Sequence, residues 1–494
     1  MNNDCDRLLL HSDLSALEKL GNFSFESKML ASQIYSSRIM NSSEVDMHLA
    51  YKENIMPWEI EIFTAYSVIY NFDNTVKEID SKSFADAITY IRNYWDDAWN
   101  ELKHSGTYAE AFMIRTAVQQ FPVQGVFLQK LFRYNYFFNF VNDRVDMKSE
   151  FISKFSTNYR DFEITAFIVF LTFSRGIDKG IEDQQIHSLL KKAFQNKEVM
   201  SVLRIEKEDN IINISDLYHG DMIKLFYGLK AHYWWPLISG TDFTYVPAPY
   251  LIVNAVTDSM LNRLTLGNKK LRNLIGKEVI ENYLYNIYEQ VETVTWISHE
   301  IEYKVKKNSY RTPDVLVGEK DYCTFYDTKE MVPSLKIREL DTKEIQKDTE
   351  IYAEAIIQIY HQIINYIKGY FELDKLYNKE HLFGVVVMLD DIALSRRKMY
   401  DRVFELYQQR LESLDIVEQR YIHSHIKVVS LRQVESKVLQ NVSFLPCIFQ
   451  QEKHPEMWDD LNFVSPSLEN GLIPIYNDYV ANIKKEILSM EKTP

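Results

Sequence analysis

Cysteine is scarce in this chain, which has only three among its 494 residues: Cys5, Cys323 and Cys447. Three widely separated cysteines build neither a disulfide framework nor a zinc site, because both need paired or closely spaced thiols. The first residues, 1–6, carry acidic side chains and lack the apolar run of a secretory signal. We therefore expect a cytoplasmic protein whose cysteines stay reduced.

Long hydrophobic runs and an excess of basic charge are also missing. The longest apolar stretch, Ile164–Phe173, covers half of the roughly 20 residues that a membrane-spanning helix needs, so we expect no membrane contact. The net charge is −14, which excludes a protein that coats nucleic acid with a uniformly positive surface. Glycine (14) and proline (12) are few, as in a globular protein, and the length allows two to four domains.

The segment around residue 320 predicts two β-strands joined by a tight polar turn. If Gly318–Asp321 form a four-residue hairpin loop, Val317 pairs with Tyr322. Counting back along the strands then places Asp314 opposite Phe325. A slip of one residue in this register would send Asp314 to the other face of the hairpin.

Two carboxylates and a lysine gather on one face of this expected hairpin. Asp327 and Lys329 are two residues apart, so they share a strand face. Asp314 becomes a diagonal neighbour of Asp327, roughly 7–8 Å away between backbones. Two acids that share a divalent cation beside a fixed ammonium are the groups needed to hydrolyse a phosphodiester. The alternative is an ordinary solvated strand end, where an Asp-x-Lys triplet is common.

Alternating helix and strand patterns surround the hairpin. Apolar residues at helical spacing and runs of β-branched residues indicate the elements. They are a helix within Leu271–Ile287, a strand within Thr293–Tyr303, the hairpin, a helix at Ile345–Phe371, a strand at Phe383–Asp390, a helix at Leu394–Leu414 and a strand at Ile426–Leu431.

This order resembles that of the PD-(D/E)XK nuclease superfamily, which has the restriction-endonuclease-like fold. Pro313-Asp314 and Asp327-Thr328-Lys329 are similar to the two halves of its signature. Gly276 followed by Glu278 and Glu281 resembles its first-helix acid, and Gln362–Tyr366 resembles the glutamine-tyrosine motif of its RecB-like branch. The match covers roughly residues 271 to 440. It implies an α/β core with a mixed sheet flanked by helices.

The resemblance implies a role for each residue of the site. Asp314 and Asp327 would be metal ligands, Lys329 would position the nucleophile, and Glu281 would complete the metal shell. Glu278 is the alternative first-helix acid, because the spacing after Gly276 is ambiguous. The backbone carbonyl of Thr328 is a further candidate ligand. An all-oxygen ligand set favours Mg²⁺, or Mn²⁺, over zinc.

Substrate contacts are expected from one helix and from basic clusters near the hairpin. Gln362 and Tyr366 either touch the substrate or brace the active face. The basic residues could bind phosphate, with Lys306 and Arg311 as the leading candidates, or form solvated faces. The clusters are Lys304, Lys306, Lys307 and Arg311; Lys336, Arg338, Lys343 and Lys347; and Arg396, Arg397, Lys398 and Arg402.

The N-terminal half is expected to be a separate, all-α domain. Its clearest helix is Ser83–Leu102, in which Ser83 is the expected N-cap. Residues 1–235 would form this accessory domain, 236–270 a linker or boundary, and 271–494 the nuclease-like domain. We expect the helical domain to recognise a target, bind a partner subunit or mediate homo-oligomer assembly.

The leading hypothesis is therefore a metal-dependent nuclease with DNA as the expected substrate. Similar architectures occur in restriction and anti-phage defence enzymes, so a role in bacterial defence follows by analogy alone. Two rival hypotheses remain. One is a non-catalytic assembly or sensor subunit that keeps the nuclease fold, and the other is an RNA-directed nuclease.

Overall fold

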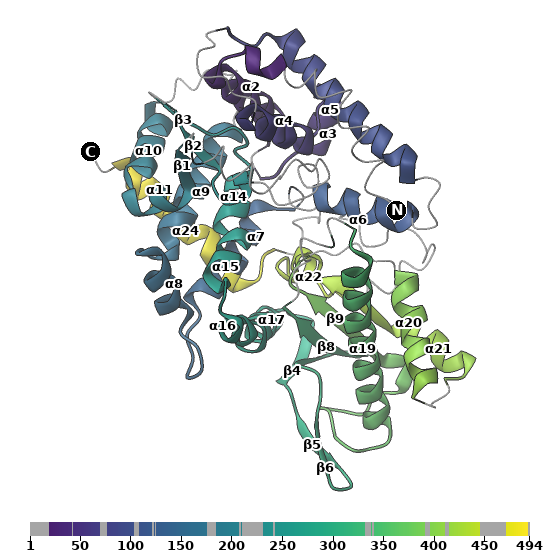
Figure 1. Cartoon of the computed structure of the whole chain (residues 1–494). Coiled ribbons are helices and arrows are strands. Elements are labelled where there is room, and N and C mark those ends of the chain that lie inside the picture. The colour runs from purple at the N-terminus through teal and green to yellow at the C-terminus, as the bar shows by residue number, and fades with distance from the viewer. Residues whose placement is uncertain are drawn as a thin grey trace. The chain divides into compact units, whose positions relative to one another are not determined.

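The computed structural model divides the chain into two compact units (Figure 1). Unit 1 contains Met1–Asn139, Met147–Leu266 and Lys484–Pro494, and unit 2 contains Phe140–Asp146 and Gly267–Ile483. The structure describes residues 19–492 except 42, 70–76, 103–107, 121–122, 124, 175–183, 207–208, 210–230, 241–242, 331–336, 338–339, 391–395, 411–413 and 445–470.

Unit 1 is mainly helical, and aromatic side chains fill much of its interior. The Tyr134–Phe140 stretch supplies Tyr134, Phe137 and Phe138 to this core, and Phe127 stacks on Phe170 with ring centroids 4.3 Å apart. The described helices are η1 (Lys19–Asn22), α2 (Phe25–Arg38), α3 (Met47–Glu53), α4 (Pro57–Ile69), α5 (Ser81–Leu102), α6 (Tyr108–Gln120), α7 (Phe127–Asn139), α8 (Met147–Phe155), α9 (Tyr159–Ser174), α10 (Gln184–Gln195), α11 (Lys197–Leu203), η4 (Ala231–Tyr233), α14 (Leu251–Val256) and α15 (Asp258–Thr265).

The expectation of an all-α N-terminal domain is wrong, because unit 1 also holds a small sheet. Strand β1 (Arg204–Glu206) pairs in parallel with β2 (Leu237–Ser239), which pairs antiparallel with β3 (Thr244–Tyr245). Strands this short show no alternation of apolar and polar residues that a sequence reading could detect.

Two further details of unit 1 differ from the expectation. Helix α5 begins at Ser81, and the side chain of Asp80 accepts a hydrogen bond from the Ser83 N–H at 2.7 Å, so Asp80 has the capping role expected of Ser83. The region 236–270, expected as a linker or boundary, holds β2, β3, α14 and α15, and the chain enters unit 2 at Gly267.

Unit 2 is built on a mixed five-stranded sheet with the order β10-β9-β8-β7-β4. Strands β4, β7 and β8 pair antiparallel, whereas β8, β9 and β10 pair in parallel. The continuous apolar strand expected at Phe383–Asp390 is β9, in which every residue except Phe383 is buried. The bounds are β4 (Val294–His299), β7 (Val315–Glu319), β8 (Cys323–Lys329), β9 (Leu382–Met388) and β10 (Ile426–Ser430).

Helices cover both faces of this sheet. Tyr288 of α17 lies against Tyr326 on one face, where their hydroxyls are 2.6 Å apart. Gly384 of β9 lies on the opposite face, where any Cβ would collide with Ile359 of α19, so glycine lets that helix pack closely. The helices are α16 (Lys269–Leu274), the π-helical turn η5 (Ile275–Ile280), α17 (Glu281–Tyr288), α19 (Thr342–Ile367), η6 (Lys379–His381), α20 (Arg396–Gln409), α21 (Ile416–His425), α22 (Leu431–Val438) and α24 (Pro474–Lys492), which continues into unit 1.

The β7–β8 hairpin forms, but the expected register is wrong by two residues. Val317 pairs with Thr324, and the Glu319 N–H donates to the Tyr322 carbonyl, so the loop is the two residues Lys320 and Asp321. A shift of two residues preserves the faces of the strands. The position of the turn is the physical cause: its centre lies between Lys320 and Asp321, one residue later than expected, and moving the centre by one residue shifts every pair by two.

The strand expected at Thr293–Tyr303 is divided in the structure. Strand β4 ends at His299, which pairs with Val315 at the start of β7. The chain then forms a separate antiparallel ribbon from β5 (Glu302–Val305) and β6 (Asn308–Arg311), which projects from the sheet (Figure 1). We call residues 302–311 the ribbon.

Candidate functional site

The two aspartates of the expected signature lie at the open end of the β7–β8 hairpin. Asp314 sits in a bend just before β7, and extending the register by one residue places it opposite Asp327 of β8. The carboxylate of Asp314 accepts hydrogen bonds from Thr328, at 2.6 Å from the N–H and 2.8 Å from the hydroxyl. The carbonyl ligand expected from Thr328 is therefore not the contact that the structure shows, and that role stays a prediction.

Asp327 lies beside Lys329 on the same strand face. Lys329 Nζ is 2.5 Å from Asp327 Oδ2, and the two form an ion pair in which the Asp327 carboxylate is buried. Burial raises the pKa of Asp327, and the Lys329 ammonium offsets part of that rise. The contact between Asp327 and Lys329 depends only on the strand itself, because alternate residues of a strand point to the same face.

Two acids on the preceding helix have different surroundings. Glu278 is buried and accepts hydrogen bonds from Arg144 at 2.7 Å and from Asn142 at 3.0 Å. Glu281 forms no hydrogen bond or ion pair with the described residues, and the charge of Asp314 acts on it. Glu278 lies within the π-helical turn η5 and Glu281 directly follows it, and such turns often accompany functional sites.

The structure thus favours Glu281 over Glu278 as the helix acid near Asp314. Gly276 helps to define this region, because its N–H donates to the Glu330 carboxylate at 3.2 Å and an added Cβ would meet Glu330 Oε2 at 2.8 Å. Glu330 directly follows β8, so the turn in the helix and the end of the strand are held together.

Burial is the largest electrostatic effect on the acids of this site, and repulsion between neighbouring acids adds to it for Asp314 and Glu281. Burial, followed by the charge of Asp327, raises the pKa of Asp314 to about 6. Burial, followed by the charge of Asp314, raises the pKa of Glu281 to about 9. We call Glu281, Asp314, Asp327 and Lys329 the carboxylate site. Its acids gain less neutralising charge from the protein than their burial requires.

The donor set fits a hard divalent cation in kind, though it does not form a three-acid cage. Among the described residues, no group of three histidine, cysteine, aspartate or glutamate side chains is close enough to hold one ion. Mg²⁺ does not need such a cage, because it keeps several waters and is often bound through one or two carboxylates. The buried oxygen of Asp327 and the raised pKa of Asp314 are what such an ion would relieve.

Gln362 and Tyr366 brace the fold in this structure. Gln362 is buried and accepts a hydrogen bond from the Tyr303 hydroxyl, which also accepts one from Asn365 at 2.9 Å. The Tyr366 hydroxyl accepts from the Tyr377 N–H at 2.9 Å and donates to the Lys375 carbonyl. Of the two roles expected for this pair, bracing is the one that the contacts support.

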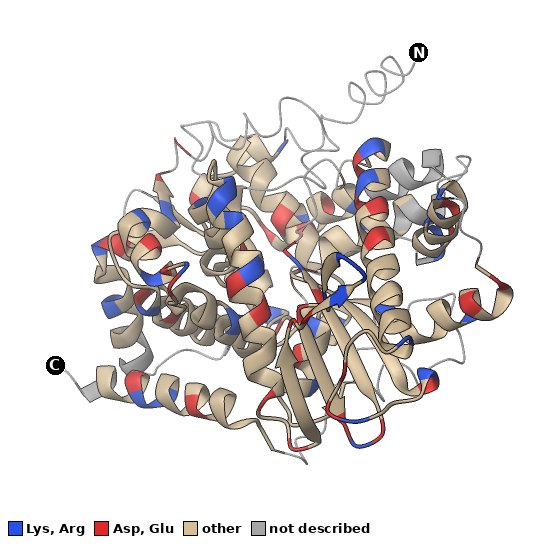
Figure 2. Ribbon diagram, turned by 90° about the horizontal axis from the view of Figure 1, so that it is seen from below, with Lys and Arg blue, Asp and Glu red and all other residues tan. Residues whose placement is uncertain are grey.

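The basic candidates fall into two groups. Arg311 pairs with Glu300 at 2.7 Å and with Glu302 at 2.6 Å, so acids of the same chain largely neutralise its charge. Arg402 pairs likewise with Glu350 and Glu405. Lys306 is exposed at the tip of the ribbon. Basic and acidic residues are interspersed over the helices in Figure 2. Lys336 and Arg338 lie outside the described residues, as does the side chain of Arg396.

The sequence reading missed several buried acids of unit 2, and Asp348 is one of them. Asp348 of α19 is 5% exposed, and burial raises its pKa to about 6. Its signal was available, because an acid lies in the apolar stripe of α19, four residues before the buried Tyr352. Tyr303 and Glu330 were also missed, and no local pattern marks either as part of the site.

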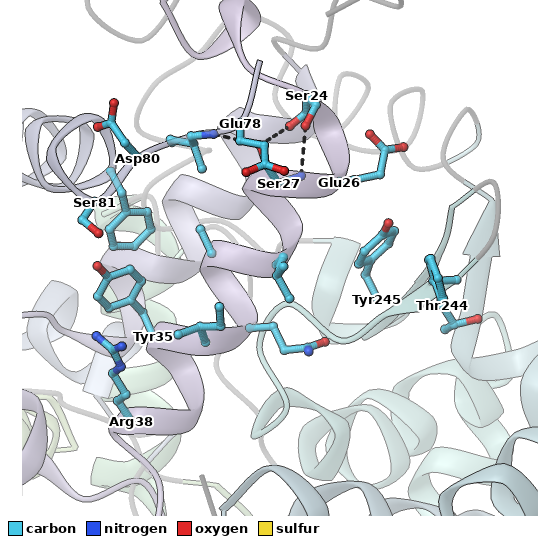
Figure 3. Close-up of a pocket in the computed structure, with 17 residues that line it drawn as sticks. Ser24, Glu26, Ser27, Tyr35, Arg38, Glu78, Asp80, Ser81, Thr244 and Tyr245 are labelled. Atoms are coloured by element: carbon cyan, nitrogen blue, oxygen red, sulfur yellow. Dashed lines mark hydrogen bonds between the residues drawn. The ribbon is translucent and has the colours of Figure 1, made fainter. Parts of the chain in front are cut away.

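Unit 1 contains a separate pocket of about 660 Å³, lined by α2, the segment before α5 and β3 (Figure 3). Tyr35 stacks on Phe84 with centroids 4.1 Å apart, and the Arg38 guanidinium lies 4.9 Å from the Tyr35 ring. None of the buried polar atoms without a hydrogen bond among the described residues belongs to this pocket. Its chemistry therefore indicates no particular ligand.

No helix among the described residues has both the length and the apolar character needed to cross a membrane. The protein is a mixed α/β protein whose larger sheet is flanked by helices. Comparisons with protein-family models, with curated proteins and with solved structures found no match to this chain.

Proposed function

We propose that the chain is a metal-dependent nuclease whose active centre is the carboxylate site of unit 2. The observation that carries the proposal is the placement of Asp314 opposite Asp327 at the open end of the β7–β8 hairpin, with the Lys329 ammonium 2.5 Å from Asp327 and Glu281 near enough for the charge of Asp314 to act on it. Buried like charges are costly, and proteins keep them chiefly where a cation or a reaction makes use of them. The helix and strand order of unit 2, which resembles a restriction-endonuclease-like core, supports the same conclusion.

The chemistry of the carboxylates and of the lysine suggests a separate role for each residue of the site. Asp314 and Asp327 would hold Mg²⁺ or Mn²⁺, and Glu281 would act on it through a coordinated water. When bound, the cation supplies Lewis acidity toward a phosphodiester and lowers the pKa of a coordinated water. Lys329 would keep an ammonium next to the reacting phosphate and stabilise negative charge that develops there.

The ion pair between Asp327 and Lys329 competes with metal binding by Asp327. Their ion pair neutralises Asp327 while no cation is present, at a separation of 2.5 Å. A divalent cation would replace the ammonium as the partner of Asp327 and release Lys329 toward the substrate. A non-catalytic subunit would keep the same ion pair as a structural contact. The ion pair alone therefore does not distinguish a nuclease from such a subunit.

The substrate we propose is DNA, and a defence role in restriction or against phage remains an analogy. No nucleic-acid-binding module is recognisable in the described residues, so the choice between DNA and RNA rests on the resemblance. Because the net charge is −14, any phosphate-binding surface must be local.

The test is incubation of the purified full-length chain with plasmid DNA, single-stranded DNA or RNA in Mg²⁺, Mn²⁺ or EDTA. Cleavage that needs the metal and disappears in Asp314→Asn and Asp327→Asn supports the proposal. Asp321→Asn is the matched control, because Asp321 is an exposed acid in the loop of the same hairpin. Absence of cleavage on every substrate, or equal cleavage in all variants, would instead favour a non-catalytic subunit.

A further inference from the structure

The ribbon is a two-stranded arm that is anchored at its base. Tyr303 of β5 is buried against Phe371, with ring centroids 4.8 Å apart, and its hydroxyl is held by Gln362 and Asn365 of α19. Ladder pairing with β6 fixes the rest, from Glu302 opposite Arg311 to Val305 opposite Asn308. The glutamine of the helix motif therefore contributes to the orientation of this arm.

The base of the ribbon is joined directly to the carboxylate site. Thr312 follows β6, its N–H donates to the Ile301 carbonyl at 3.0 Å, and its hydroxyl accepts from the Ile301 N–H at 2.8 Å. Asp314 comes two residues later. The direction of the ribbon and the position of Asp314 are consequently set by the same short, buried segment.

The tip of the ribbon carries positive charge that the described residues do not neutralise. Lys304, Lys306 and Lys307 are exposed, and none forms an ion pair or hydrogen bond with a described residue. Arg311 at the base differs, because Glu300 and Glu302 engage it. Three free ammonium groups on one projecting loop contrast with the acidic chain as a whole.

Lys306 also occupies a backbone position that a lysine rarely adopts. Its φ is +57°, in the left-handed region where glycine or asparagine is favoured. Glycine there would relieve the strain and asparagine would fit at lower cost, yet the chain has a cation. Strain of this kind is often retained where a side chain serves a function.

We propose that the tip of the ribbon binds the phosphate backbone of duplex DNA and thereby places the strand at the carboxylate site, an inference that rests on the proposed nuclease function. Lysines bind phosphates as point charges and read no sequence. A two-stranded ribbon has dimensions that a duplex groove admits. The exposed aromatic ring of the ribbon, Tyr310, already stacks on Tyr303 with ring centroids 5.9 Å apart, so it offers less surface to an unpaired base, which favours a duplex over a single strand.

The experiment measures binding without cleavage. Full-length Asp327→Asn protein is titrated against a fluorescent 30-base-pair duplex over a range of salt concentrations. Combining this change with K304A, K306A and K307A should weaken binding and reduce the slope of log K against log salt by about 2.7, since each lost phosphate contact contributes about 0.9. The control combines the same background with K148A, K154A and K197A, three exposed lysines of unit 1.

The outcomes separate the two proposals. Equal salt slopes in the ribbon variant and the control overturn the ribbon inference, whether or not the wild type cleaves DNA. A reduced slope in a protein that cleaves nothing supports the ribbon and rejects the nuclease. Tighter binding to a single strand than to the duplex overturns the duplex assignment. Unchanged circular dichroism in the variants establishes that they are folded.

A single substitution provides an independent check. Lys306→Gly should raise the thermal midpoint, because glycine adopts a positive φ without strain, and should lower duplex affinity, because it removes one ammonium. A merely structural turn would show the gain in stability with unchanged affinity, and that result would overturn the role of Lys306.

Discussion

Acids of the two units differ in whether a basic side chain neutralises them. In unit 1, Glu59 pairs with Arg92 at 2.7 Å, Glu163 pairs with Arg160 at 2.5 Å, and Asp258 pairs with Lys130. Burial alone would raise the pKa of Asp258, but Lys130 and the Tyr134 hydroxyl outweigh it and lower that pKa.

In the carboxylate site of unit 2, the single ammonium of Lys329 pairs with Asp327, while the charge of Asp327 acts on Asp314 and that of Asp314 acts on Glu281. Asp314 accepts two hydrogen bonds from Thr328 but has no cation of its own, and the pKa of Glu281 rises to about 9. Glu278, only three residues before Glu281, has Arg144 as its partner. The comparison shows that an acid neutralised by the fold has a structural role, whereas repelling acids leave a charge deficit that a ligand can fill.

The largest effect is expected from removing the groups of the carboxylate site. If the chain is a nuclease, Lys329→Met should lower the cleavage rate by about 10²–10³, because it removes a fixed charge at the reacting phosphate. The rate is measured on the preferred substrate under single-turnover conditions. Lys320→Met, in the exposed loop of the same hairpin, is the control and should leave the rate unchanged.

The structural acids of unit 1 predict a loss of stability instead. Lys130→Met should cost about 1–3 kcal/mol in the free energy of unfolding, because it leaves the half-buried Asp258 without its cation. Urea denaturation measures this loss. Asp314→Asn should instead raise the free energy of unfolding of the metal-free protein at about pH 8, because it removes a carboxylate whose charged form is unfavourable there. A similar loss of stability in both variants would contradict the distinction between the two units.

Metal binding should compensate for the repulsion, and it should do so more at high pH. The pKa of Asp314 rises from 3.8 to about 6 and that of Glu281 from 4.5 to about 9, so the folded state holds these protons more tightly than the unfolded state. Metal-free stability should therefore fall as the pH rises from about 4 to about 9.

A divalent cation should reverse that fall, by about 2.7 kcal/mol at 100 times its Kd. Thermal midpoints with Mg²⁺ and with EDTA, compared at about pH 5.5 and pH 8.5, measure the effect. A Mg²⁺ shift that is equal at both pH values, or absent from both, would show that these acids do not hold the ion.

The smallest and most discriminating effect concerns the two helix glutamates. Glu281→Gln should weaken the pH dependence of stability and reduce cleavage, because it removes a charge that acts on Asp314. Glu278→Gln should leave the pH dependence of stability and the cleavage rate in place. It should cost about 1–3 kcal/mol of stability through its weakened contact with Arg144. The reverse pattern would assign Glu278 to the site.

Local patterns in the sequence gave a large part of the secondary structure of unit 2. The apolar stripe between Ile345 and Phe371 corresponds to α19, which begins earlier because Asp341 caps it. The pairing of Asp327 with Lys329 on one face also followed from the sequence, since it depends only on the two-residue period of a strand.

Long-range contacts decided the rest. The two-residue loop moved Asp314 into line with Asp327, and the distant residue Arg144 engaged Glu278 and left Glu281 near the aspartates. The separate ribbon and the pairing of Arg311 with Glu300 were equally invisible to a sequence reading. Periodicity is a property of neighbouring residues, so the sequence alone determined faces and elements. Only the tertiary structure determined which charges meet, because that depends on turns and partners far apart in the chain.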